Sequence, residues 1–220
     1  MKLERVRAVR KRSRWFDGLL TRNPVLVGGM AIPFAVVITT SLKNSVSISI
    51  LLACSLIPTV LLASLVGARL PRWGASILYT LFSLALIVAC VPLILPISPE
   101  VADSLGIFVP LLSVNTLLLT LCGRCAGRRS KPLFALVDAV SYSVGFALVM
   151  CLLALLREWF GMGTVWGVLA HAPFTLGGVQ MTFAGFILLA LLSAAARFLR
   201  RAVLLLIYRS DNPRTAPPSA

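Results

Sequence analysis

The residues best suited to chemistry in this sequence are two cysteines, Cys122 and Cys125, in a C-x-x-C pattern. Such a pair can bind a metal ion or cycle between dithiol and disulfide. Zinc and iron–sulfur clusters usually need four ligands, so the remaining ligands of a metal site here would come from another subunit. The alternative is two free thiols, which is the ordinary state in a reducing cytoplasm.

Two further polar residues lie inside long apolar segments, and they are candidates for an ion or proton path. Asn115 interrupts one segment, and Asp138 lies six residues after Pro132 in the next. An ionisable side chain at such a depth in a membrane helix is a functional-site hypothesis by default. The alternative for Asp138 is a capping or snorkelling carboxylate near the cytoplasmic interface.

The composition predicts the elements that must position these residues. Of 220 residues, 59% are hydrophobic and 13% are charged, and the mean hydropathy is +0.95. Long apolar runs without strand-like alternation predict an all-α polytopic membrane protein and exclude a β-barrel. The first apolar run begins only at Pro24 and is followed by more membrane sequence, so we expect no cleaved signal peptide.

Runs of about 20 apolar residues predict six transmembrane helices. They are expected at residues 24–42, 46–66, 75–97, 104–121, 133–156 and 181–207. With both termini in the cytoplasm, all but two of the 21 Lys and Arg residues, Lys43 and Arg157, fall on or near the cytoplasmic side. This positive-inside bias explains the net charge of +14 by topology, and we expect a lipid bilayer and no nucleic acid as the partner of the basic residues.

The first and fourth spans contain helix-breaking residues, and Asn23-Pro24 resembles a helix start with Asn as the N-cap. Proline removes a backbone hydrogen bond and glycine permits unwinding, so both spans are predicted to be interrupted. The alternative is two ordinary kinked helices, because both residue types are common in membrane helices. The predicted broken-helix site comprises Gly28, Gly29, Pro33, Gly106, Pro110 and Thr116.

An interrupted span at the same place in each half predicts two three-helix repeats, and an odd number of spans per repeat inverts the second. The repeats are expected at residues 23–100 and 101–208. Residues 1–22 are predicted to be a basic cytoplasmic interfacial segment, and residues 209–220 a disordered cytoplasmic tail. Two broken helices entering from opposite sides would expose backbone groups that must line a site.

Three stretches, taken in order, resemble the Rnf/Nqr membrane-subunit family. They are Asn23–Val27 (NPVLV), Ser104–Leu111 (SLGIFVPL) with Val114–Asn115, and Leu156–Glu158 followed by Gly161–Thr164. The branch resembled includes the E subunit of Rnf complexes and the D subunit of sodium-translocating NADH:quinone reductases. The similarity extends from Asn23 to about Thr164.

The resemblance implies a bacterial inner-membrane subunit that pairs with a homologous subunit of opposite topology. In the family, the broken helices of the two subunits hold an iron–sulfur centre through cysteines in the first and fourth spans. This sequence departs from that pattern, because Ile32 and Thr116 occupy the two cysteine positions. The sequence therefore does not identify a cofactor for this chain.

The function predicted from this resemblance is that of a non-catalytic integral membrane subunit. It would belong to an electron transport complex that couples electron transfer to translocation of sodium ions or protons, together with other subunits of that complex. The usual intramembrane iron–sulfur ligands would be missing. The alternative is a cluster-free membrane transporter or assembly protein that reuses the same scaffold.

Overall fold

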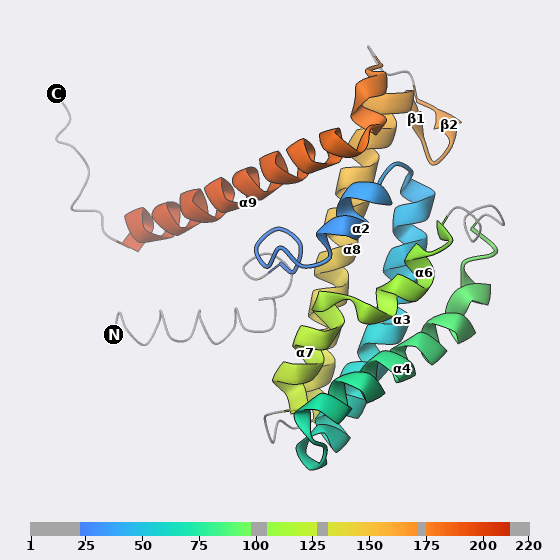
Figure 1. The fold of residues 1–220 in the computed structure, drawn as a ribbon. Coiled ribbons are helices and arrows are strands. Elements are labelled where there is room, and N and C mark those ends of the chain that lie inside the picture. The colour runs from blue at the N-terminus through green and yellow to red at the C-terminus, as the bar shows by residue number, and fades with distance from the viewer. Residues whose placement is uncertain (1–22, 98–104, 127–131, 171–174, 212–220) are drawn as a thin grey trace.

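The structure, a computed structural model, describes residues 23–97, 105–126, 132–170 and 175–211. It is a helical bundle in which a long helix from each half of the chain lies at the centre (Figure 1). The elements in chain order are α2 (Ile32–Val37), α3 (Leu42–Val66), η2 (Gly67–Arg69), α4 (Arg72–Cys90), η3 (Val91–Leu93), α6 (Phe108–Leu111), η4 (Leu112–Val114), α7 (Thr116–Ala126), α8 (Pro132–Met162), β1 (Thr164–Val165), β2 (Val168–Leu169), η5 (Gly177–Gln180) and α9 (Thr182–Asp211).

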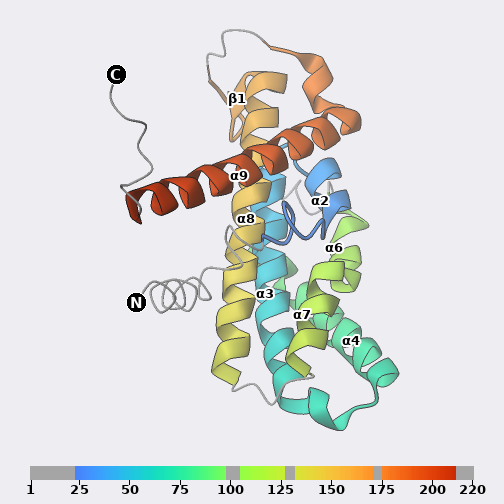
Figure 2. The same cartoon turned by 90° about the vertical axis from the view of Figure 1, so that its left-hand side faces the viewer.

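The core lies where α3 packs against α8, and Figures 1 and 2 both show these two helices side by side. Ile48, Leu52 and Leu56 of α3 and Phe146 and Met150 of α8 are fully buried there. α4 packs on one side of α3, against α7 and η4, while α9 packs against α2. The C-terminal part of α9 extends away from the bundle (Figure 1).

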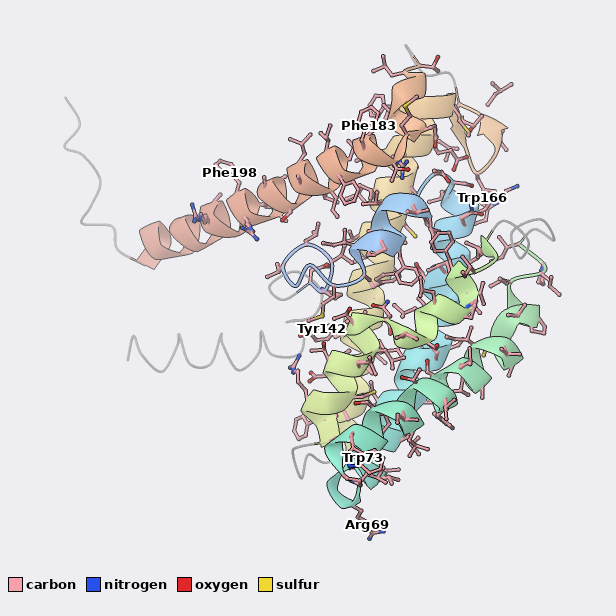
Figure 3. The ribbon with its side chains drawn as sticks, in the orientation of Figure 1. Arg69, Trp73, Tyr142, Trp166, Phe183 and Phe198 are labelled. Atoms are coloured by element: carbon pink, nitrogen blue, oxygen red, sulfur yellow. The ribbon has the colours of Figure 1, made fainter. Side chains whose placement is uncertain are left out.

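The outer surface of the bundle is apolar, as expected of helices that face lipid. Within the described residues, five helices are long and apolar enough to cross a membrane. Tryptophans mark both ends of the bundle: Figure 3 shows Trp73 with Arg69 at one end and Trp166 at the other. Amphipathic aromatic side chains of this kind are typical of membrane–water interfaces. The prediction of a helical membrane protein is therefore confirmed.

The first of the six predicted spans does not form a spanning helix. The chain forms a turn after Asn23 and then only the six-residue helix α2, so the five spanning helices of the described residues are Leu42–Val66, Trp73–Leu93, Phe108–Ala126, Pro132–Met162 and Thr182–Leu199. The fifth predicted span is longer than expected, because α8 continues past residue 156 to Met162. The predicted segment 1–22 and nearly all of the predicted tail, residues 212–220, lie outside the described residues.

A β-hairpin with a two-residue turn follows α8. It forms the one sheet in the described part of the chain. β1 and β2 pair antiparallel with Thr164 opposite Leu169. The two turn residues, Trp166 and Gly167, have φ of 60° and 78°. Positive φ at both positions is the geometry of a type I′ turn, which fits the twist of a hairpin.

Candidate functional site

The first interrupted segment begins at a buried asparagine that holds a single turn. Asn23 Oδ1 accepts hydrogen bonds from the backbone N–H groups of Val25 (3.0 Å) and Leu26 (3.1 Å). Its Nδ2 donates to the carbonyl oxygen of Gly145 on α8 (2.8 Å). Asn23 therefore caps the turn, as predicted, and also anchors it near the middle of α8.

The turn cannot continue as a helix because the backbone becomes left-handed directly after it. Gly29 and Ala31 have φ of 63° and 62°. Gly28 has no room for a side chain, since an added Cβ would lie 2.7 Å from the carbonyl oxygen of Pro24. α2 then starts at Ile32, with Pro33 in its first turn. The chain is thus irregular around Gly28, Gly29 and Pro33, and the role of these residues in a broken-helix site stays a prediction.

The second interrupted segment breaks at another asparagine. α6 contains Pro110 and runs into η4, after which Asn115 is extended with φ −62° and ψ 133°. Asn115 Oδ1 accepts a hydrogen bond from the N–H of Leu117 (3.1 Å), which caps α7. Gly106, with φ of 37°, lies in the turn before α6. The main break of this segment is at Asn115, and the role of Gly106, Pro110 and Thr116 in a broken-helix site stays a prediction.

The two interrupted segments meet through aromatic side chains. The ring of Phe34 on α2 and the ring of Phe108 on α6 have centroids 6.4 Å apart and an interplanar angle of 70°. This edge-to-face arrangement is a favourable one for aromatic pairs. The structure therefore brings together the two stretches that the sequence marks as broken.

The residues at the two positions of the family cysteines are the first residues of the helices that follow the breaks. Ile32 begins α2, and Thr116 begins α7. Isoleucine has no ligand atom and threonine offers only a neutral hydroxyl, whereas iron–sulfur clusters are held by thiolates. These residues do not fit the intramembrane centre that the resemblance implies.

Cys122 and Cys125 are both buried on α7, six and nine residues beyond Thr116. At 1.5 Å per residue they lie about 9 and 14 Å along the helix from that position. Among the described residues, no group of three or more His, Cys, Asp or Glu side chains lies together. A metal site at this pair stays a prediction that requires ligands from another subunit.

Asp138 lies far from Asn115 along the bundle. Its Oδ2 is 3.9 Å from Nη2 of Arg124, and the Nη1 of Arg124 donates to the hydroxyl of Tyr142 (2.9 Å). Arg124 is nine residues past Asn115 on α7, so about 14 Å separates them along the axis. The two predicted path residues therefore mark different depths, and their role stays a prediction.

Sequence reasoning missed a buried charged pair near the end of α8. The residue exposures of Arg157 and Glu158 are 0% and 2%. Arg157 donates from Nη1 to Thr39 Oγ1 (2.9 Å) and the carbonyl of Val36, and from Nε and Nη2 to carbonyls of residues 179–181. The sequence did carry one signal, the charge itself, because ionisable residues within an apolar run are rarely incidental.

Comparison with known proteins places these features in a family. A family model described as "Rnf-Nqr subunit, membrane protein" matches residues 12–200. The D subunit of the Na(+)-translocating NADH-quinone reductase of Pseudoalteromonas translucida is 25% identical over 155 residues, which cover 70% of this chain and 72% of that protein.

A second group of relatives carries a different name. The E subunit of the ion-translocating oxidoreductase complex of Shewanella oneidensis is 29% identical over 150 residues, covering 68% of this chain and 64% of that protein. Its counterpart in Aliivibrio fischeri is 29% identical over 152 residues, covering 68% and 65%. With the family model spanning the whole described bundle except the end of α9, the chain belongs to the Rnf-Nqr family of membrane subunits.

Proposed function

We propose that this chain is an integral membrane subunit of a bacterial inner-membrane complex that couples electron transfer to ion translocation. The observation that carries the proposal is the family match over residues 12–200, since the relatives are named as parts of ion-translocating reductases. The pairing of two interrupted segments through Phe34 and Phe108 supports it, because such segments mark binding sites in membrane proteins. The alternative of a transporter or assembly protein is not favoured by these relatives.

The chain is further proposed to consist of two inverted three-helix repeats, with six crossings when the interrupted first segment is counted. The order of elements supports this: an interrupted segment, a long central helix and a flanking helix occur twice. The contacts are reciprocal, since α2 packs against α9 of the second half while η4 and α7 pack against α4 of the first. Reciprocal contacts of this kind are expected of a pseudo-two-fold arrangement.

The proposed topology has both termini in the cytoplasm. Arg69 ends η2 and Arg124 lies in the last turn of α7, on the side where the positive-inside rule expects basic residues. Lys43 is near the start of α3 at the opposite end. The basic segment 1–22 would lie on the same side as Arg69. A membrane-impermeant label on cysteines introduced near either terminus would test this assignment.

A homologous membrane subunit of opposite topology is the proposed partner. Gly28, Gly29 and Gly106 are exposed, and so are Val114 and Thr116 beside the second break. Irregular backbone is tolerated at membrane depth only where protein or a polar cavity covers it. A second protein with a similar pair of interrupted segments would cover both breaks.

No electron-transfer step is assigned to the usual centre, since Ile32 and Thr116 do not fit it. Asn115 and Asp138 are proposed as polar residues of an ion path, and Cys122 with Cys125 as a site that gains ligands from a partner. Loss of iron and acid-labile sulfide from the purified complex on changing both cysteines to serine would support the metal site. Unchanged iron and sulfide would remove it.

The experiment that tests the proposed function is purification through a tag on this chain from membranes extracted in a mild detergent. We expect co-purification of a homologous membrane subunit and of subunits that carry flavin or iron–sulfur clusters. Deletion of the chain should abolish electron-transfer-driven ion uptake by membrane vesicles. Recovery of the chain without any redox subunit, together with unchanged ion uptake in the deletion strain, would contradict the proposal.

A further inference from the structure

Three buried polar side chains between α4 and the segment formed by η4 and α7 lack a hydrogen-bond partner among the described residues. The atoms are Tyr79 Oη, Ser83 Oγ and Asn115 Nδ2. Their residues are 2%, 0% and 3% exposed. Buried polar groups are nearly always hydrogen-bonded to protein or to ordered water, so each of these atoms calls for a partner.

The three side chains face the same interface. Tyr79 and Ser83 are four residues apart on α4, in the buried stripe that also contains Ala75 and Ile87. Residues at this spacing lie on one face of a helix, about 5–6 Å apart. α4 packs against α7 and η4, and Asn115 is the residue that joins those two elements.

They also lie at successive depths. Tyr79 Oη is at the end of the bundle, because a Cβ added to Gly67 would meet it at 2.6 Å and Ala126 at 2.4 Å. The backbone of Ser83 lies one turn farther along α4 than that of Tyr79, about 6 Å farther from this end. Asn115 lies eleven residues before Ala126 on the other side of the interface, about 16 Å from the same end. The row therefore leads from the end of the bundle to the break between η4 and α7.

Several buried hydroxyl groups elsewhere in the bundle are satisfied within their own helix. Ser49, Thr59 and Ser143 each donate to the carbonyl four residues earlier, at 2.6–2.9 Å. The hydroxyl of Ser83 forms no such hydrogen bond, although the carbonyl of Tyr79 lies four residues earlier in the same helix. The remaining unsatisfied atoms of the described residues, on Ser45, Ser141 and Gln180, belong to other elements.

We propose that Tyr79, Ser83 and Asn115 bind a row of internal water molecules. Hydroxyl groups both donate and accept, so water satisfies Tyr79 and Ser83 in either direction. Asn115 Oδ1 already accepts from Leu117, so the group that Asn115 presents is its NH₂, which needs an acceptor. A water oxygen meets that need, whereas a sodium ion would be repelled by the N–H dipoles. A row of this kind admits protons and opposes the passage of sodium ions. This consequence for ion selectivity rests on the proposed function.

Hydroxyl-radical footprinting with X-rays tests the water directly, because radicals formed from bound water label the adjacent side chain. Tyr142 is the matched control, since it is 7% exposed and its hydroxyl is bonded to Arg124. We expect Tyr79 in the intact protein to be labelled at least as fast as Tyr142. Slower labelling of Tyr79 than of Tyr142 would overturn the proposal.

The melting temperature provides a second test, because it should change in opposite directions depending on whether water binds the hydroxyls. If water binds the hydroxyls, Tyr79→Phe and Ser83→Ala each remove a bonded group and lower the melting temperature, by about 2–4 °C. If the hydroxyls are unsatisfied, both changes raise it. Ser143→Ala is the control for losing a hydroxyl bonded to its own helix. Both measurements are made on this chain, so they can fail while the proposed role in a complex stands.

Discussion

Arg157 and Glu158 are neighbours on α8, yet they bind the facing ends of two successive helices. Arg157 donates to the carbonyl of Val36 in the last turn of α2. Glu158 Oε2 accepts the N–H of Leu42, the first residue of α3, at 2.7 Å. Each charge has the sign that stabilises the helix end it binds. The pair thereby fixes the corner between the interrupted segment and the central helix, which holds α2 against Phe108.

Arg157→Leu should strongly destabilise the protein. The guanidinium fork bonds four backbone carbonyls and one hydroxyl, and these acceptors would lose their donor inside an apolar environment. Leaving one buried acceptor without its donor costs about 1–3 kcal/mol, so the loss of several should cost at least about 3 kcal/mol. Thermal unfolding in detergent should therefore show a melting temperature lower by at least roughly 6 °C.

Arg197→Leu is the matched control, because Arg197 is exposed on α9. Its effect on the free energy of unfolding should stay within about 0.5 kcal/mol. The melting temperature of Arg157→Lys should lie between those of Arg157→Leu and Arg197→Leu. An ammonium group keeps the charge but cannot form the five hydrogen bonds of the planar guanidinium. Equal melting temperatures for Arg157→Leu and Arg197→Leu would disprove the role assigned to Arg157.

Glu158→Ala should loosen the corner between α2 and α3. The carboxylate also accepts the N–H of Gly167 at 2.8 Å and the hydroxyl of Thr164 at 3.3 Å, so its loss frees the hairpin as well. A cysteine placed at Ser41, in a background without the native cysteines, reports on this corner. We expect maleimide to label it several-fold faster in Glu158→Ala, and only slightly faster in Glu158→Gln, which keeps one acceptor oxygen. Identical labelling rates in the parent protein and in both variants would contradict the role of Glu158 as the cap of α3.

The helical architecture was predictable from the sequence because lipid leaves the backbone few options. Long apolar runs therefore predicted four of the spanning helices closely. The end of α8 was not predictable in this way. Adjacent charges at Arg157 and Glu158 look like the start of a loop until their partners are known, and two of these partners, Val36 and Leu42, are more than 100 residues away in the chain.

The site was predictable only in its location. Sequence patterns indicate where a helix breaks, but they do not indicate which side chains meet across the break, so the contact of Phe34 with Phe108 could not be inferred. The sequence identifies Asn115 only as a polar residue within a membrane span. Its function as the cap of α7 depends on the extended conformation of its backbone, which the sequence does not indicate. Tyr79 and Ser83 gave no signal, since buried hydroxyls in helices are usually satisfied locally.

Gly67→Ala should disturb the junction at the end of the bundle opposite the hairpin. A Cβ at this position would lie 2.4 Å from the Cβ of Ala126 and 2.6 Å from Tyr79 Oη, so α3 and α7 would have to separate. Overpacking of this kind costs about 1–3 kcal/mol. Gly123→Ala is the control on α7, because nothing lies within 4 Å of its added Cβ. That change should be neutral or stabilising by up to about 1 kcal/mol, as alanine favours helix.

The contact between Phe34 and Phe108 should appear as a coupling energy between the two halves of the chain. In a double-mutant cycle with Phe34→Leu and Phe108→Leu, the double variant should be less destabilised than the sum of the single variants, by about 0.5–1.5 kcal/mol. Leucine keeps most of the apolar volume, so the cycle isolates the interaction of the rings. Phe146 on α8, which is fully buried and makes no ring contact with Phe34 in the described part of the chain, provides the control cycle with Phe34. Strict additivity for Phe34 with Phe108 would mean that the two interrupted segments are held together by their backbones and not by these rings.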